Sequence, residues 1–191
     1  MIGILALQGG FQAHGRTLDA LGLPWRLVRL PRDLEDVDAL ILPGGESTTM
    51  LKLLDAFALF APLEAFAQTG KPVLGTCAGA ILMSRRVLHP EQRSLGWLPA
   101  TIERNFYGAQ QHSFKANVAI PEWQLAEVPA LFIRAPRFSA LGEDVRVISR
   151  WEDDITGITW RQFTAVTYHP ELTDETAFHQ AWYQRFVESR P

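Results

Sequence analysis

Cysteine is the scarcest chemistry-bearing residue of this sequence, which has 191 residues and a single cysteine, Cys77. One cysteine excludes an internal disulfide framework and any zinc site made of several cysteines. No spacing typical of metal ligands separates the histidines, which are His14, His89, His112, His169 and His179. We therefore expect no metal and no other cofactor.

The sequence also lacks a long apolar run and an excess of basic residues. No stretch approaches the roughly 20 apolar residues that span a bilayer. The strand-like run 2–7 is not preceded by the basic flank of a secretory signal. Together with the unpaired cysteine, these absences predict a cytoplasmic protein. A net charge of -3 offers no electrostatic footprint for nucleic acid, so we expect neither nucleic-acid nor membrane binding.

The first part of the chain alternates strand and helix patterns. Continuous apolar runs are typical of strands buried on both faces, and stretches with helical periodicity separate them. Expected strands are 2–7, 25–30, 39–42 and the run before Cys77; expected helices are 11–21, one capped by Ser or Thr within 47–49 and continuing through Leu54, and 60–68. This alternation predicts a parallel sheet covered by helices on both faces.

From about Ser94 the pattern changes to short β-like pieces separated by turn residues. These pieces are 100–104, 113–120, 131–134, 145–151, 155–160 and 163–168, and an amphipathic helix over 174–188 follows them. They predict an antiparallel addition to the sheet or a meander packed beside it. With 47% hydrophobic residues and no linker or repeat, residues 1–191 are expected to form a single domain. Its predicted class is α/β: a three-layer open sheet, mostly parallel with antiparallel additions, with helices on both faces.

The stretch around Cys77 has the pattern of a nucleophile elbow. An apolar run ends in this cysteine, which stands between Gly75 and Gly79, and a helix-like stretch follows. The glycines allow a turn so sharp that the side chain projects from it, and a helix N-terminus favours the reactive thiolate. A buried packing cysteine is the alternative, because unpaired cysteines are often buried. The flanking glycines favour a nucleophile.

A second glycine pair, Gly44 and Gly45, follows the predicted strand 39–42 and precedes a helix start. Such a break directs several backbone N–H groups at one place, which suits an anion. The N–H of Gly45 and that of Ala78, the residue after the nucleophile, would together form an oxyanion hole, in which each donor lowers the barrier by about 3 kcal/mol. A plain tight turn is the alternative.

His169 is the best candidate for the base. It follows the predicted strand 163–168 and precedes Pro170 and Glu171, so it lies at a strand end, where the active-site residues of open α/β sheets collect. Its imidazole can accept the thiol proton and return it to a leaving amine, and Glu171 could hold the ring in the right tautomer. A capping or core histidine is the alternative. The set fits acyl transfer from an amide or an ester.

At these residues the chain resembles the class I (triad) glutamine amidotransferases, and more closely the glutaminase subunits of two-component pyridoxal 5'-phosphate synthases. The matching segments are LALQGGFQAH from Leu5, LPGGESTTM from Leu42, GTCAG from Gly75, ERNFYG from Glu103, SF at Ser113, FIRAP from Phe132 and HPELT from His169. They extend over nearly the whole chain. The resemblance implies a flavodoxin-like fold and hydrolysis of L-glutamine to glutamate and ammonia.

The resemblance also implies a role for each matching residue. The triad would be Cys77 as nucleophile, His169 as general acid and base, and Glu171 as its orienter. L-Glutamine would be held by Gly45, Glu46, Ser47, Arg104, Ile133 and Arg134. The contact with the synthase subunit, which receives the ammonia in a hetero-oligomer, would be made by Gln8, Gly9, Gly10, Phe11 and His14.

Two positions depart from the family pattern, and two alternatives stay open. Ala109 stands where arginine is usual and Gly10 where aspartate is common; neither belongs to the triad. The chain could serve another biosynthetic synthase, such as the histidine-pathway cyclase, or act as a non-catalytic sensor with an elbow cysteine. The RNFYG and FIRAP segments argue against the first alternative, and the pair His169 and Glu171 against the second.

Overall fold

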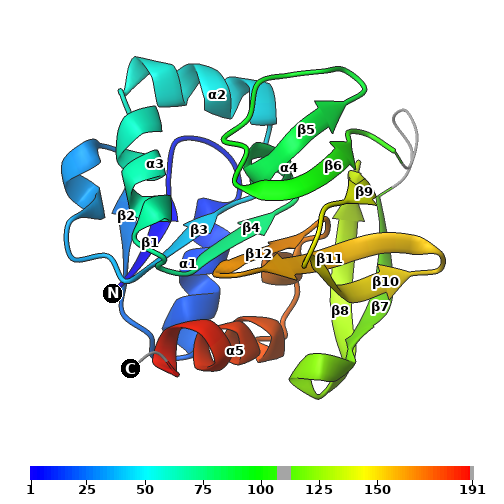
Figure 1. The fold of residues 1–191 in the computed structure, drawn as a ribbon. Helices are drawn as coiled ribbons and strands as arrows, with labels where there is room; N and C mark the ends of the chain where they lie inside the picture. The colour runs from blue at the N-terminus through cyan, green and yellow to red at the C-terminus, as the bar shows by residue number, and fades with distance from the viewer. Residues whose placement is uncertain (107–112, 190–191) are drawn as a thin grey trace.

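The computed structural model describes residues 1–106 and 113–189, and a ten-stranded sheet organises them (Figure 1). One half of this sheet is parallel, in the order β2-β1-β3-β4-β12. Its strands are β1 (Ile2–Leu5), β2 (Trp25–Val28), β3 (Ala39–Leu42), β4 (Val73–Thr76) and β12 (Phe163–Val166). The continuous apolar runs of the sequence therefore form the buried strands that they predict.

Helices cover both faces of the parallel half (Figure 1). One face carries α2 (Ser47–Ala56), α3 (Phe60–Gln68) and α4 (Ala78–Met83), and the other carries α1 (Phe11–Ala20) and α5 (Ala177–Tyr183). Successive side chains of a strand point to opposite faces. In β3, Leu40 and Leu42 accordingly join the apolar core under α2 and α3, whereas Ile41 packs in the core that contains Trp182 of α5. The three-layer prediction is confirmed.

The second half of the sheet adds β11, β9 and β6 in antiparallel pairing, with β5 parallel to β6 and β10 beside β11. The bounds are β5 (Ser84–Leu88), β6 (Leu98–Glu103), β9 (Arg137–Leu141), β10 (Arg146–Trp151) and β11 (Asp154–Trp160). A separate hairpin is formed by β7 (Ser113–Ile120) and β8 (Leu125–Ile133). The predicted antiparallel addition is therefore present, and the separate piece is a two-stranded hairpin and not the meander that was the alternative.

Several element predictions need correction. Strands β5 and β9 were not predicted. Strand β5 ends the sheet order and exposes Arg85 and Arg86, and charged residues on such an edge hide the apolar signal. The closing helix begins at Ala177, three residues later than predicted, and continues after Tyr183 as a π-helical turn, η4 (Gln184–Glu188). The remaining short helices are η1 (Pro31–Leu34), η2 (Pro121–Trp123) and η3 (Pro170–Leu172).

The N-cap of α2 is also different from the prediction. Glu46, and not Ser or Thr, caps this helix, because its carboxylate accepts hydrogen bonds from the backbone N–H groups of Thr48 and Thr49. A carboxylate at this place also suits the positive end of the helix dipole.

The carboxyl ends of the parallel strands meet at one edge of the sheet. Segments that follow them there are Gln8–Gly10 after β1, Pro43–Gly45 after β3, Cys77 after β4 and His169 after β12. These segments lie far apart in the sequence, and the parallel pairing brings them together.

Candidate active site

Cys77 stands in a strained turn between β4 and α4. Its φ of 47 and ψ of -103 lie outside the regions that side chains normally adopt, and its backbone N–H donates to the Val166 carbonyl at 2.9 Å. A Cβ on Gly75 would collide with Met83, and one on Gly79 with the Leu42 carbonyl. The two glycines therefore let α4 pack closely behind the turn, as in a nucleophile elbow.

His169 lies between Cys77 and Glu171. Its Nδ1 is 2.7 Å from Glu171 Oε1, and the ring is also hydrogen-bonded to Cys77, so Nε2 faces the thiol. The backbone N–H of His169 donates to the Leu131 carbonyl at 2.9 Å, which ties the base to β8. A Cβ on Gly44 would overlap the His169 ring, so this position needs glycine. The structure thus brings the three predicted triad residues together.

The surroundings of His169 and Glu171 shift the pKa of each in the direction that favours its charged form. Burial lowers the pKa of His169, but the charge of Cys77 and the hydrogen bonds to Cys77 and Glu171 outweigh it and raise the pKa to about 10. Burial raises the pKa of Glu171, but His14 and His169 together lower it to about 2. An anionic Glu171 therefore faces a protonated His169, which can transfer a proton to a leaving amine.

The loop with Gly44 and Gly45 packs against the segment after β1. The backbone N–H of Gly10 donates to the Gly44 carbonyl at 2.9 Å, and that of Glu46 donates to Gln8 Oε1 at 2.7 Å. Because C=O and N–H point in opposite directions in a trans peptide, the N–H of Gly45 points away from Gly10. The segment predicted to contact a partner therefore touches the loop predicted to stabilise an oxyanion.

Three of the residues predicted to hold L-glutamine form a polar cluster with Gln92. Arg104 donates from Nη2 to Glu46 Oε1 at 3.1 Å and from Nη1 to Gln92 Oε1 at 2.6 Å. Ser47 Oγ donates to Gln92 Oε1 at 3.1 Å. Burial raises the pKa of Glu46, but its hydrogen bonds with Thr48 and Thr49 lower it to about 2.

Gln92 is the site residue that the sequence does not reveal. It stands in a polar stretch without a motif, and only the fold places it beside Arg104. Its Nε2 is buried and has no hydrogen-bond partner among the described residues. Arginine is only a donor, so the orientation of the amide is fixed by Arg104. A buried amide N–H group is thus left in this cluster.

Ile133 and Arg134 lie at and just after the end of β8. Leu131, two residues before Ile133, forms an isolated bridge with His169. Arg134 is exposed and has a positive φ of 43. The structure does not join these two residues to Arg104 through any described hydrogen bond.

His14 requires a correction. It was predicted to contact a partner, but its side chain is fully buried, at 0% exposure. It lies behind the triad, with Nε2 3.6 Å from Glu171 Oε1. Gly9 is exposed, and Gln8, Gly10 and Phe11 are partly exposed, so these four can still form a contact surface. Ala109, the other departure from the family pattern, lies outside the described residues.

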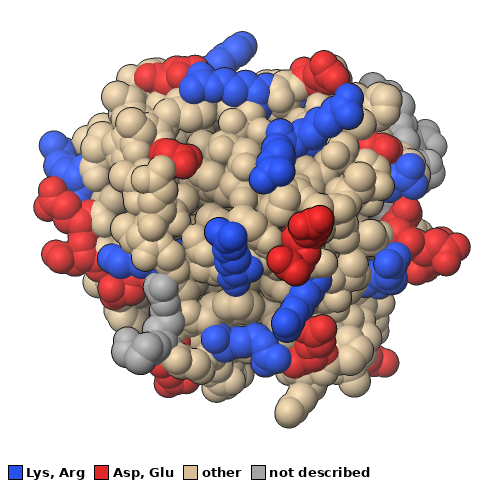
Figure 2. All heavy atoms as spheres, in the orientation of Figure 1, with Lys and Arg blue, Asp and Glu red and all other residues tan. Residues whose placement is uncertain are grey.

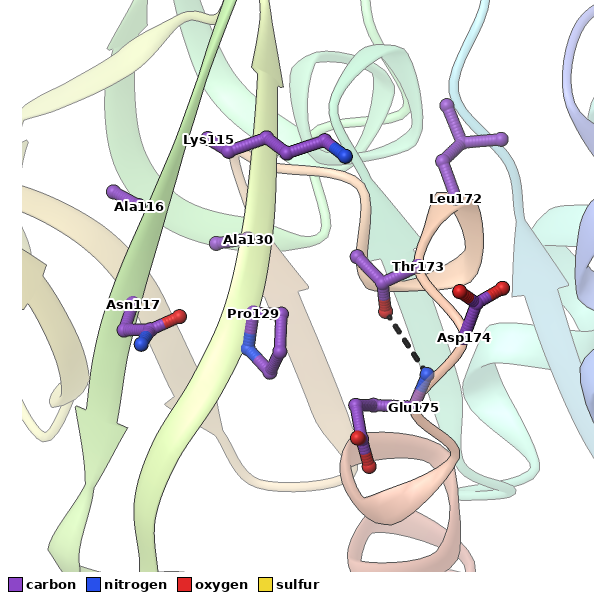
Figure 3. Close-up of a pocket in the computed structure, with 9 residues that line it drawn as sticks. All are labelled: Lys115, Ala116, Asn117, Pro129, Ala130, Leu172, Thr173, Asp174 and Glu175. Atoms are coloured by element: carbon purple, nitrogen blue, oxygen red, sulfur yellow. Dashed lines mark hydrogen bonds between the residues drawn. The ribbon is translucent and has the colours of Figure 1, made fainter.

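Two hollows flank the segment that follows Glu171. One of about 330 Å³ lies between the hairpin β7–β8 and this segment (Figure 3) and contains none of the triad residues. The other lies between α1 and the same segment and is lined partly by Glu171 and Arg16. Leu172 borders both hollows and is 40% exposed. The segment after Glu171 therefore separates two hollows, one of which adjoins α1.

The described residues hold no group of three or more His, Cys, Asp and Glu side chains suited to a metal ion. Figure 2 shows basic and acidic side chains interspersed on the face seen in Figure 1. None of the helices in the described ranges combines the length and apolarity needed to cross a membrane.

Comparisons with known proteins identify one family. The sequence profile of the SNO glutamine amidotransferase family matches residues 4–189. "Pyridoxal 5'-phosphate synthase subunit PdxT" of Halalkalibacterium halodurans is 42% identical over 189 residues, which cover 99% of this chain and 96% of that protein. The protein of the same name from Bifidobacterium longum is 41% identical over 185 residues, 94% of this chain and 97% of its own.

Solved structures give the same picture. A crystal structure of a glutamine amidotransferase is 38% identical, has a TM-score of 0.90, and is matched over 96% of this chain and 97% of that one. The structure of PurLQS from Thermotoga maritima has a TM-score of 0.69 over 96% of both chains, but at 17% identity it shows a common fold alone.

Proposed function

The chain belongs to the SNO glutamine amidotransferase family, and from this we propose that it is the glutaminase subunit of a pyridoxal 5'-phosphate synthase. It hydrolyses L-glutamine to L-glutamate and ammonia, which passes to a synthase subunit for vitamin B6 biosynthesis. The observation that carries the proposal is that Cys77, which follows β4, forms one hydrogen-bonded series with His169 and Glu171, which follow β12.

The reaction proceeds in two acyl-transfer steps. With its proton on His169, the Cys77 thiolate attacks the side-chain amide carbon of glutamine, and the N–H groups of Gly45 and Ala78 stabilise the oxyanion. His169 gives its proton to the amide nitrogen, so the C–N bond breaks, ammonia leaves and a thioester remains. His169 then takes a proton from water, which attacks the thioester carbon; the C–S bond breaks and releases glutamate and the Cys77 thiolate, beside a protonated His169 as at the start. Glu171 holds the ring in the required tautomer throughout.

The polar cluster around Arg104 selects the substrate. A guanidinium can meet the α-carboxylate of glutamine with two parallel hydrogen bonds, and the Glu46 carboxylate suits the α-ammonium group. In the free protein these two side chains pair with each other at 3.1 Å. Glutamine replaces this pair by two charge-matched contacts, and Ile133 and Arg134 complete the pocket from the β8 side.

The synthase subunit binds at the surface formed by Gln8, Gly9, Gly10 and Phe11. This segment contacts the Gly44–Gly45 loop directly, through the hydrogen bonds from Gly10 and Glu46. Docking there acts on the oxyanion loop and raises the glutaminase rate. The ammonia is released inside the complex, which limits its protonation by bulk water.

A mixing assay tests the proposal. Ammonia release from glutamine is measured for the chain alone and with a synthase subunit of pyridoxal 5'-phosphate synthase. We expect slow release alone and much faster release with the partner. Cys77→Ala should abolish both rates while circular dichroism and thermal unfolding stay close to wild type, because the thiol is the nucleophile.

Each outcome has a separate meaning. Ammonia release by Cys77→Ala at the wild-type rate would remove the mechanism. A wild-type rate that no synthase subunit increases would leave a glutaminase of another pathway. Relatives named as PdxT at 42% and 41% identity favour the pyridoxal phosphate pathway over that alternative.

A further inference from the structure

A series of buried polar side chains extends from the triad to α1 and α5, the two helices on one face of the sheet. His14 of α1 has Nε2 3.2 Å from Thr76 Oγ1 and 3.6 Å from Glu171 Oε1. Its Nδ1 is 3.0 Å from Nε2 of His179, which belongs to α5. The side chains of His14, Thr76 and His179 are all at 0% exposure. The two acyl-transfer steps proposed above give these three side chains no role.

Three side chains, those of His14, Thr76 and His169, approach one atom, Glu171 Oε1. Thr76 Oγ1 donates to Glu171 Oε1 at 3.5 Å, and His169 Nδ1 lies 2.7 Å from the same oxygen. The second oxygen, Oε2, is buried without a hydrogen-bond partner among the described residues. The orientation of the carboxylate therefore depends on the donors that surround Oε1.

The hydrogen-bond partners of each ring nitrogen indicate which nitrogens carry a proton. In one arrangement every donor points toward Glu171: His179 Nε2–H donates to His14 Nδ1, His14 Nε2–H to Thr76, and the Thr76 hydroxyl to Oε1. In the reverse arrangement an unprotonated His14 nitrogen faces a carboxylate oxygen at 3.6 Å, and two lone pairs repel in a medium of low dielectric. The first arrangement is therefore the favourable one.

His179, at the far end of the series, favours the same arrangement of protons. His179 Nδ1 is buried and has no partner in the described part of the chain. In the reverse arrangement this nitrogen would carry a buried, unpaired N–H, which is rarer and costlier than an unpaired acceptor. Burial lowers the pKa of both His14 and His179, so both rings are neutral and each carries one proton.

We infer that His14 is a positioning residue of the glutaminase reaction: its Nε2–H, through Thr76 and Glu171 Oε1, holds the carboxylate that orients His169. The inference rests on the proposed function and extends it. Because His14 belongs to α1, whose first residue, Phe11, is part of the proposed partner surface, a movement of this helix also moves the support of the triad.

Two substitutions at His14 test the inference in the complex with the synthase subunit. His14→Phe keeps the ring volume and removes both nitrogens, so kcat should fall by on the order of 10-fold to 100-fold, as for other orienting partners of a catalytic histidine. KM for glutamine should stay close to wild type, because His14 does not touch the substrate pocket. His14→Gln restores an N–H at the position of Nε2, and kcat should return to within about 3-fold of wild type.

Leu18→Ala provides the control for a general loss of stability. Leu18 lies one turn further along α1 and is fully buried in the apolar core that also contains Trp182 of α5. Its variant should unfold at a lower temperature and retain the wild-type kcat. A folded His14→Phe variant with the wild-type kcat would overturn the inference, as would a Leu18→Ala variant with the same loss of kcat.

A second measurement needs no variant. Nitrogen-15 spectra of the histidine-labelled protein distinguish protonated from unprotonated ring nitrogens. At pH 7 we expect a neutral His14 with the proton on Nε2 and a neutral His179 with the proton on Nε2. A charged His14, or one protonated on Nδ1, would overturn the inference even if His14→Phe does not fold. A wild-type complex that releases no ammonia would instead refute the proposed function, and the spectra would still test the positioning geometry.

Discussion

Arg104 shows how a single side chain organises the proposed substrate pocket. Its guanidinium bonds the carboxylate of Glu46 and the amide oxygen of Gln92, and Gln92 in turn accepts from Ser47. These side chains come from three separate segments. A guanidinium has several N–H donors in a fixed planar fork, so it can bind these two acceptors in the free protein and a substrate carboxylate afterwards.

Replacement of this arginine should therefore affect substrate binding first. For Arg104→Lys we expect KM for glutamine to rise by on the order of 10-fold with a smaller change of kcat, because lysine lacks the bidentate fork. Steady-state kinetics with the synthase subunit provide the measurement. Arg93→Lys is the control: Arg93 follows Gln92 in the chain but pairs with Asp55 at the surface. An equal rise of KM in both variants would contradict the role of Arg104.

At the scale of elements, the contact between the ends of β1 and β3 connects the proposed partner surface to the oxyanion loop. Gly9 has a φ of +93, and a Cβ at this position would overlap the Gly44 carbonyl. Gly10, the next residue, has a φ of -81, and the nearest atom to its Cβ position is Glu171 Oε1 at 3.6 Å. The backbone conformation and close packing therefore require glycine at position 9, whereas position 10 has room for a side chain.

This difference predicts unequal effects of the same substitution. Gly9→Ala should displace the Gly44–Gly45 loop, lower the synthase-stimulated glutaminase rate by 10-fold or more and destabilise the protein by about 1–3 kcal/mol, through backbone strain and overlap. Gly10→Ala should change both quantities little, since there is room for a methyl group. Denaturant unfolding and ammonia release measure the two effects. Equal losses in both variants would rule out the packing explanation.

At the scale of the whole molecule, buried titratable groups link α1, η3 and α5. Glu171, His14 and His179 are separated in sequence by up to 165 residues and lie within hydrogen-bond reach of their neighbours. The state of these groups therefore influences the stability of the complete fold.

The sign of this influence follows from the pKa directions. Burial lowers the pKa of His14, and that of His179 to about 3, whereas unfolded histidine titrates near 6.5. Below pH 6.5 the unfolded chain binds more protons, so stability decreases as the pH falls. Each histidine contributes up to about 1.4 kcal/mol per pH unit. The lowered pKa of Glu171 adds a similar loss only below its unfolded value of about 4.5.

Urea unfolding between pH 6.5 and 5 should therefore show a steep loss of stability, and His179→Phe should make the slope shallower. His89→Phe is the matched control, because His89 is exposed and the exchange removes no buried ring. Equal slopes in wild type and His179→Phe would show that His179 is not a buried neutral group.

The sequence by itself determined the parallel half of the fold and the identity of the proposed triad. Apolar runs bounded by glycine and proline specify the strands, because burial on both faces requires uninterrupted apolar residues. Cys77 and His169 each follow such a strand, so the parallel order alone predicts that they meet at one edge. Motif resemblance added glutamine and the synthase partner.

Only the tertiary structure decided the surroundings of these residues. Local patterns cannot show that His14 is buried against Glu171, that Gln92 joins Arg104, or that the charged edge strand β5 extends the sheet. The reason is physical: burial and hydrogen bonding depend on which distant segments pack together, and a polar side chain carries no signal of its future partner. His14 and His179, 165 residues apart, become neighbours only when α1 and α5 pack on the same face of the sheet.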